Sequence, residues 1–178
     1  VIEVFNDLSE KDRQSQSLVY DELTGILCKQ EVEQKIKQAE EDFKKVSVPF
    51  GLICFGIDNL SQIAEKYKER VAEKILIMAA KNLSANLRIT DETGRWGNDS
   101  FMLIVKFVDR EQLHDIAQNM LITMNNCFLK EENEIIMASV SAGGSVFKDN
   151  DSIYTITERA VHNLEKARLT DKGSLFID

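Results

Sequence analysis

The segment at residues 49–57 reads PFGLICFGI and contains no charged residue. A continuous apolar run of this length is typical of a buried strand. The segment that follows, residues 60–87, carries apolar side chains at steps of three and four residues, for example Ile63 and Tyr67. That spacing predicts one long amphipathic helix directly after the buried strand.

Other patterns extend this alternation along the chain. Helical spacing covers residues 31–44, 111–128 and 153–168, whereas strand patterns cover a hairpin within residues 85–107 and the segments 135–147 and 174–177. The resulting order is helix, strand, long helix, hairpin, helix, strand, helix and strand. It predicts an α+β domain in which helices cover a mainly antiparallel sheet.

The size of the chain fits one domain. Its 178 residues are 43% hydrophobic, which is enough for a single well-filled core. We predict a linker helix at residues 1–20 and the domain at residues 21–178. Because the first residue is Val1 rather than methionine, we expect the chain to be part of a longer protein, with attached or partner signalling domains.

The formal net charge of −8 disfavours a general nucleic-acid binder, because neutralising a phosphate backbone requires clustered basic side chains. The three cysteines, Cys28, Cys54 and Cys127, are far apart and show no zinc or disulfide pattern, which is typical of the cytoplasm. No apolar run reaches the roughly 18 residues of a membrane span. We expect a cytoplasmic domain without membrane contact, alone or as the cytoplasmic part of a larger membrane-anchored protein.

Several short motifs occur in a fixed order along residues 20–178. They are DELTG at 21–25, CFGID at 54–58, RITDETGRWGNDSF at 88–101, SVSAGG at 139–144 and ERAVHNLEKARLTDKG at 158–173. In this combination the chain resembles the GGDEF family of bacterial diguanylate cyclases, which make cyclic di-GMP from two GTP molecules. The resemblance implies a five-stranded sheet flanked by helices, related to the palm of nucleotide cyclases and polymerases.

The family signature, G-G-(D/E)-E-F, is degenerate in this chain and reads Gly97-Asn98-Asp99-Ser100-Phe101. The resemblance implies metal ligands at the third signature position, here Asp99, and on the preceding strand, here Gly56. Glycine offers no side-chain ligand, and Ser100 replaces a second carboxylate. Mg²⁺-assisted phosphoryl transfer requires hard oxygen ligands, so we expect no bound metal, no cofactor and no catalytic residue.

The nucleotide-binding positions of the family are altered as well. Its guanine-reading asparagine and aspartate match Ala64 and Glu73, and its phosphate-binding lysine and arginine match Arg168 and Lys172. Asp58 lies one pleat period beyond Gly56, about 6–7 Å along the strand, too far to replace the lost ligand unless the metal moves. We interpret Asp58, Glu73, Arg168 and Lys172 as a vestigial nucleotide site.

One family motif is intact. The R-x-x-D of the inhibitory product-binding site, which ends five residues before the signature, matches Arg88-Ile89-Thr90-Asp91 in register. An arginine fork can bind O6 and N7 of guanine or a phosphate, and an aspartate can accept from guanine N–H groups. Arg88 and Asp91 are therefore the predicted cyclic di-GMP site.

The hypothesis from the sequence is a catalytically inactive GGDEF-like signalling domain that is a cyclic di-GMP receptor. The alternatives are a protein-interaction or dimerisation module without nucleotide, which includes a homodimer, and an active diguanylate cyclase or a GTP-binding allosteric domain. Simpler structural interpretations also exist for single residues. They make Asp99 and Ser100 part of a hairpin turn, Asp58 the N-cap of the following helix, and residues 21–25 a capping turn.

Overall fold

The computed structural model describes residues 19–131 and 134–178. Within these ranges the helices are α2 (Lys29–Val46), α3 (Leu60–Tyr67), α4 (Glu69–Ala85), α5 (Arg110–Asn125) and α6 (Ile153–Thr170). The strands are β1 (Phe50–Ile57), β2 (Glu92–Arg95), β3 (Ser100–Lys106), β4 (Phe128–Glu131), β5 (Glu134–Met137), β6 (Val140–Val146) and β7 (Leu175–Ile177). None of the helices in these ranges is both long and apolar enough to cross a membrane. Residues 1–18 of the predicted linker lie outside the described residues.

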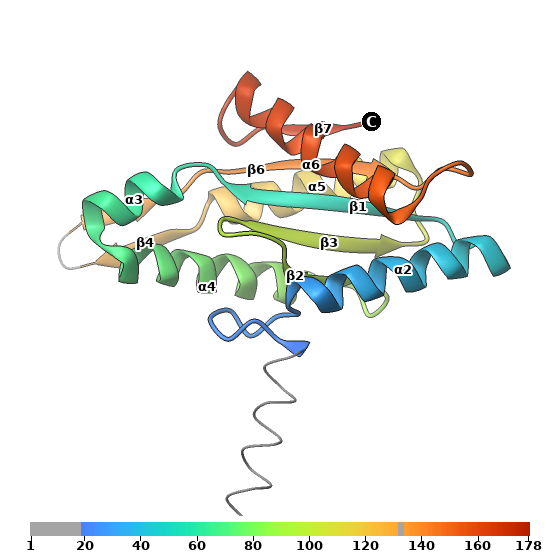
Figure 1. The fold of residues 1–178 in the computed structure, drawn as a ribbon. Coiled ribbons are helices and arrows are strands. Elements are labelled where there is room, and N and C mark those ends of the chain that lie inside the picture. The colour runs from blue at the N-terminus through green and yellow to red at the C-terminus, as the bar shows by residue number, and fades with distance from the viewer. Residues whose placement is uncertain (1–18, 132–133) are drawn as a thin grey trace, which may run out of the picture.

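The main sheet has five strands in the order β2-β3-β1-β6-β7. The β2–β3, β3–β1 and β1–β6 pairs are antiparallel, and only the β6–β7 pair is parallel. The predicted α+β fold with a mainly antiparallel sheet is thus confirmed, and the sheet is mixed. The apolar run forms β1, which lies in the middle of the sheet between β3 and β6 (Figure 1). All of its residues are buried, which explains why its sequence shows no polar alternation.

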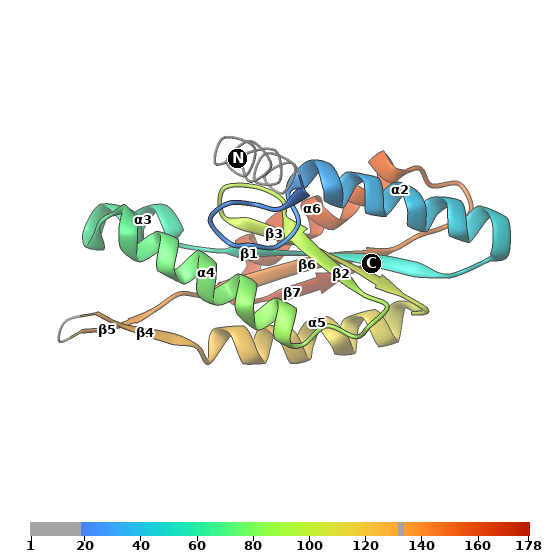
Figure 2. The same cartoon turned by 90° about the horizontal axis from the view of Figure 1, so that it is seen from below.

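Two apolar cores lie on opposite faces of this sheet. Side chains that alternate along β1 separate into them: Ile53 and Phe55 face the core shared with α4 and α5, whereas Leu52 and Cys54 face the core shared with α2 and α6. Figure 2 shows the strands between these two helix layers, α2 with α6 and α4 with α5. The alternation places Gly56 on the α6 side, which is the side that matters for the candidate site.

The predicted long helix over residues 60–87 is wrong, because the chain breaks at Lys68. This residue has φ 75° and ψ 158°, a backbone conformation that L-residues rarely adopt. The break divides the segment into α3 and α4. The helical spacing of apolar residues continues across Lys68, because α3 and α4 contact each other and bury their apolar side chains in the same core. Periodicity alone therefore did not reveal the break.

The predictions for residues 111–128 and 135–147 also need correction. The helix ends at Asn125, and Phe128 begins β4, a strand that the sequence patterns did not predict. The strand predicted at 135–147 is divided, because residues 134–137 pair with β4 in a separate two-stranded sheet while residues 140–146 pair with β1. Figures 1 and 2 show this hairpin beside α3 at one end of the domain.

Candidate functional site

Gly56 and Ser100, the two positions without the expected carboxylates, face each other in the sheet. They are direct partners in the antiparallel register of β1 and β3. Asp99 comes just before β3, in the turn of the β2–β3 hairpin, and its carbonyl accepts from the amide of Ile57 at 2.9 Å. The register thus brings residues 97–101 to the end of β1. Asp99 lies in the predicted hairpin turn, whereas Ser100 is the first residue of β3.

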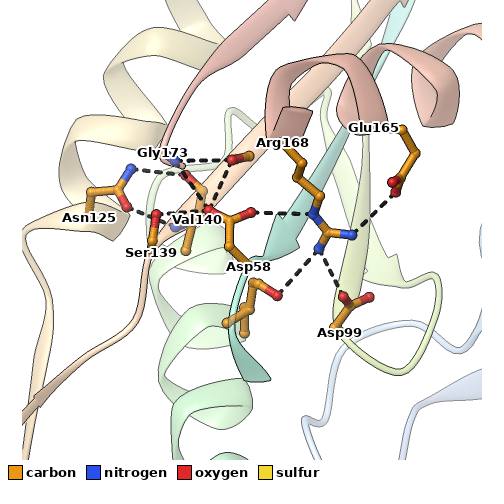
Figure 3. A network of polar contacts seen from close by, with 10 residues as sticks. Asp58, Asp99, Asn125, Ser139, Val140, Glu165, Arg168 and Gly173 are labelled. Atoms are coloured by element: carbon orange, nitrogen blue, oxygen red, sulfur yellow. Dashed lines mark hydrogen bonds and ion pairs between the residues drawn. The ribbon is translucent and has the colours of Figure 1, made fainter. Parts of the chain in front are cut away.

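Arg168, in the last turn of α6, fills the space between these strand ends (Figure 3). Its Nη2 donates to Asp99 Oδ2 at 2.8 Å and to the carbonyl oxygen of Ile57 at 3.3 Å. Its Nε donates to Asp58 Oδ1 at 3.3 Å, and its Nη1 donates to Glu165 Oε1 at 3.3 Å. One guanidinium therefore joins α6 to the ends of β1 and β3.

Asp58 is the most buried acid of this group, with 3% of its side chain exposed. Besides Arg168, it accepts hydrogen bonds from the hydroxyls of Ser139 and Ser141 at 2.8 and 2.9 Å and from the amide of Gly173 at 3.2 Å. The N-cap interpretation of Asp58 is wrong, because Asn59 holds that position and makes no side-chain cap bond. These donors were not predicted from the sequence, although Ser139 and Ser141 belong to the motif SVSAGG.

Neighbouring carboxylates stabilise the positive charge of Arg168. Burial alone would lower the pKa of Arg168, but the charges of Asp99, Glu165 and Asp58 outweigh that effect and raise it. Since an arginine guanidinium does not deprotonate in proteins, the two aspartates always have a positive charge beside them.

The residues at this place do not fit a divalent metal site. A Cβ added to Gly56 would lie 2.3 Å from Arg168 Nη2 and 2.8 Å from its Cζ, so the guanidinium occupies the volume that a ligand side chain at position 56 would need. Asp58 and Asp99 already accept hydrogen bonds from the same cation. Among the described residues, no group of three or more His, Cys, Asp or Glu is arranged to hold a metal ion.

The side chains at the other positions of the predicted vestigial nucleotide site do not join this cluster, although the amide of the Lys172–Gly173 peptide donates to Asp58. Glu73 lies in α4, and Lys172 is exposed in the loop after α6. Within residues 19–131 and 134–178, neither side chain forms a hydrogen bond or ion pair with Asp58 or Arg168. The structure brings together the side chains of Asp58, Asp99 and Arg168, but not those of Glu73 and Lys172.

Arg88 and Asp91 form a second polar site, in the turn between α4 and β2. Arg88 Nε donates to Asp91 Oδ2 at 2.8 Å, and Nη2 donates to Asp91 Oδ1 at 2.9 Å. Nη2 also donates to the carbonyl oxygen of Lys106 at 2.9 Å. The hydrogen bonds that Arg88 donates to the Asp91 carboxylate raise the pKa of Arg88. The Arg88 side chain is 45% exposed and that of Asp91 is 1% exposed, so the pair presents its arginine to solvent.

The turn at residues 21–25 has a structural role. The carboxylate of Asp21 accepts from the amide and the hydroxyl of Thr24 at 2.9 and 2.5 Å, and Gly25 has φ 71°. The helix that follows begins after Cys28 rather than after this turn. The motif DELTG is thus a hydrogen-bonded turn, as predicted, but it does not cap α2.

Comparison with known proteins identifies the family. The model described as "Diguanylate cyclase, GGDEF domain" matches residues 18–174. Because the match covers most of the chain, the protein belongs to the GGDEF family and is related to diguanylate cyclases.

Curated relatives are bacterial and much longer. Diguanylate cyclase DgcP of Pseudomonas aeruginosa is 22% identical over 169 residues, which are 95% of this chain and 25% of DgcP. Diguanylate cyclase DgcM of Escherichia coli K12 is 19% identical over 169 residues, which are 93% of this chain and 40% of DgcM. The chain therefore spans less than half the length of either relative.

Solved structures agree on the fold. The coiled coil and GGDEF domain of DgcB from Caulobacter crescentus, in complex with cyclic di-GMP, superposes with a TM-score of 0.90 at 14% identity and covers 99% of this chain and 94% of that one. Diguanylate cyclase SiaD of Pseudomonas aeruginosa, in complex with its activator SiaC, superposes with a TM-score of 0.87 at 15% identity, covering 99% of this chain and 68% of that one. Relatives of this domain thus bind cyclic di-GMP or a partner protein.

Proposed function

We propose that this chain is a catalytically inactive GGDEF domain that acts as a cyclic di-GMP receptor through Arg88 and Asp91. The proposal has two parts, the loss of the cyclase reaction and the retention of a ligand site. They depend on different residues and can be tested separately.

The observation that supports inactivity is the position of the Arg168 guanidinium beside Gly56 and Ser100. A diguanylate cyclase must hold Mg²⁺ against the phosphates of GTP with oxygen ligands. Here the two facing positions offer a hydrogen atom and a hydroxyl, and the space next to them contains an arginine. Ala64 stands in the position of the guanine-reading asparagine of the family, and its side chain cannot form a hydrogen bond with the base.

The observation that supports a receptor is the exposed arginine of the Arg88–Asp91 pair. Guanine presents two acceptors, O6 and N7, to a guanidinium, and a phosphate can bind the same group. Because Nε and Nη2 of Arg88 already donate to Asp91 and to the Lys106 carbonyl, Nη1 is the nitrogen that a ligand would contact first. The carboxylate of Asp91 fixes the arginine in one orientation, which reduces the conformational entropy lost when a ligand binds. Ile89, which is fully exposed within the same turn, offers apolar surface beside the arginine.

A second candidate is an interaction module that binds no nucleotide. It is favoured by the burial of Asp91, whose carboxylate is 1% exposed and already accepts two hydrogen bonds from Arg88. A carboxylate in this state can contact guanine N–H groups only if the pair opens. In that case Arg88 and Asp91 would stabilise the turn rather than bind a ligand.

Calorimetric titration with cyclic di-GMP distinguishes the two candidates. We expect the wild-type chain to bind with a dissociation constant of about 1 μM or lower, equivalent to about −8 kcal/mol. Arg88→Ala and Asp91→Ala should abolish the heat of binding, and Arg88→Lys should weaken it because lysine cannot form the fork. Arg70→Ala is the matched control, since Arg70 is exposed and pairs with Glu131, far from the turn in sequence.

Each variant is first checked for native circular dichroism at the temperature of the titration. Absence of binding to the wild-type chain would favour the interaction module, and unchanged binding by Arg88→Ala would show that the ligand binds elsewhere. A parallel titration with GTP and Mg²⁺ tests the remaining alternative. Stoichiometric GTP binding without turnover would indicate an allosteric nucleotide domain.

A further inference from the structure

We propose that the Arg168 guanidinium is the permanent cation of the Asp58–Asp99 site, and that Gly56 is the residue that makes room for it. The chain itself thus supplies the positive charge that a metal would otherwise provide, and the fold of this edge is independent of divalent ions. This inference concerns the folded state and does not depend on whether cyclic di-GMP binds.

The buried charge of Asp58 requires a cation nearby. Asp58 is 3% exposed, and a carboxylate buried to that degree is costly unless a cation and hydrogen-bond donors compensate it. Ser139, Ser141 and Gly173 supply neutral donors to one oxygen, and Arg168 is the cation at the other. Asp99 adds a second negative charge beside the same guanidinium.

The geometry around Arg168 resembles that around a bound cation. The guanidinium contacts three groups from two segments: the Ile57 carbonyl and Asp58 at the end of β1, and Asp99 in the turn before β3. These oxygens converge on one point, as the ligands of a bound cation do. A planar fork with several N–H donors can satisfy them together, which a lysine ammonium does less well.

The volume beside Gly56 is taken up by the guanidinium of Arg168. A Cβ at position 56 would lie 2.3 Å from Arg168 Nη2, well inside van der Waals contact. Any side chain at position 56 would therefore displace the guanidinium from Asp99 and Ile57. Glycine at 56 and arginine at 168 form a matched pair, although 112 residues separate them in the sequence (168 minus 56).

The pairing of Gly56 with Arg168 can be tested by thermal unfolding, because it predicts the direction of the Tm shift of each variant. In the wild-type background, Gly56→Ala should lower the Tm by about 5 °C, because the guanidinium must leave its acceptors. Arg168→Ala should lower the Tm by about 5–10 °C. In the Arg168→Ala background, Gly56→Ala should change the Tm by less than about 2 °C, because the two contacts with the guanidinium are gone and the next atom, Leu164 Cδ2 at 3.0 Å, belongs to a flexible side chain.

Two further variants test whether Arg168 acts through its charge or only through its packing. Asp99→Asn should reduce the Tm loss caused by Arg168→Ala, because fewer negative charges are then left without a cation. Glu165→Gln is the matched control: Glu165 also contacts Arg168, but its side chain is 57% exposed, so we expect a Tm shift of less than about 2 °C.

Magnesium titration completes the experiment. The Tm of the wild-type chain in excess MgCl₂ should equal that in NaCl of the same ionic strength to within about 1 °C. A saturable rise with Mg²⁺ would overturn the proposal, because it would show that a metal ion still binds the native fold. Equal effects of Gly56→Ala in the two backgrounds would also overturn it, since the glycine would then not be paired with the arginine.

Discussion

Removal of Arg88 should destabilise the fold measurably, apart from any effect on ligand binding. The change would leave the Asp91 carboxylate, 1% exposed, with a single side-chain donor, the Thr90 hydroxyl at 3.2 Å. Two charge-assisted hydrogen bonds, at 2.8 and 2.9 Å, are lost. Breaking a buried ion pair from one side costs about 3–5 kcal/mol, and the 45% exposure of Arg88 reduces this because water can replace part of it.

We therefore expect Arg88→Ala to lower the free energy of unfolding by about 2 kcal/mol, equivalent to about 4–8 °C in Tm. Urea unfolding followed by circular dichroism measures it. Asp91→Ala should cost about 1–2 kcal/mol, because the freed arginine can reach water, and the double variant should cost about 1 kcal/mol less than the sum. Lys45→Ala is the control, since its pair with Glu41 joins side chains that are 70% and 43% exposed. Additive effects, or an Arg88→Ala variant as stable as this control, would refute the reasoning.

Three more predictions concern the core and its edges. Gly143→Ala should cost about 3 kcal/mol or more in urea unfolding, because a Cβ there would lie 1.9 Å from the Leu164 amide nitrogen in the backbone of α6, which cannot move as a side chain does. Burial raises the pKa of the Cys54 thiol to about 12, so iodoacetamide at pH 8 should leave Cys54 unmodified in the native protein and alkylate it in urea, as read by mass spectrometry. Burial alone would raise the pKa of Asp151, but hydrogen bonds, first among them that from Arg159, lower the pKa. The ionised Asp151 carboxylate should therefore stabilise the fold fully well above about pH 4. The difference in stability between wild type and Asp151→Asn should shrink as the pH falls below about 4 through the native pKa.

The fold could be predicted from the sequence where burial alone determined the pattern. β1 was evident because both of its faces are covered, so that all of its residues are apolar or glycine. The break at Lys68 was not evident, because it is a backbone dihedral in a segment whose apolar spacing is unbroken. β4 was missed because its apolar residue Phe128 is exposed and therefore does not mark a buried face. Residues 135–137 of β5 were predicted as strand, but only as part of one strand over residues 135–147.

The candidate site was predictable in its residue types but not in its contacts. Comparison with the family motif predicted that Gly56 and Ser100 lack the carboxylates of the family, and the register of β1 and β3 places these two residues opposite each other. The position of Arg168 could not be deduced, because its contact with Asp58 joins residues 110 positions apart and depends on how α6 packs on the sheet. Arg168 was assigned from the sequence to the vestigial nucleotide site. In the structure, its guanidinium donates hydrogen bonds to two aspartates.

The most direct test of catalytic inactivity is a turnover assay. The purified chain is incubated with GTP and Mg²⁺, and in parallel with Mn²⁺, and the products are separated by chromatography. We predict that no cyclic di-GMP forms, because Gly56 has no side-chain ligand, Ser100 offers a hydroxyl in place of a carboxylate, and Arg168 fills the space beside Gly56. Accumulation of cyclic di-GMP in proportion to protein concentration and time would contradict this.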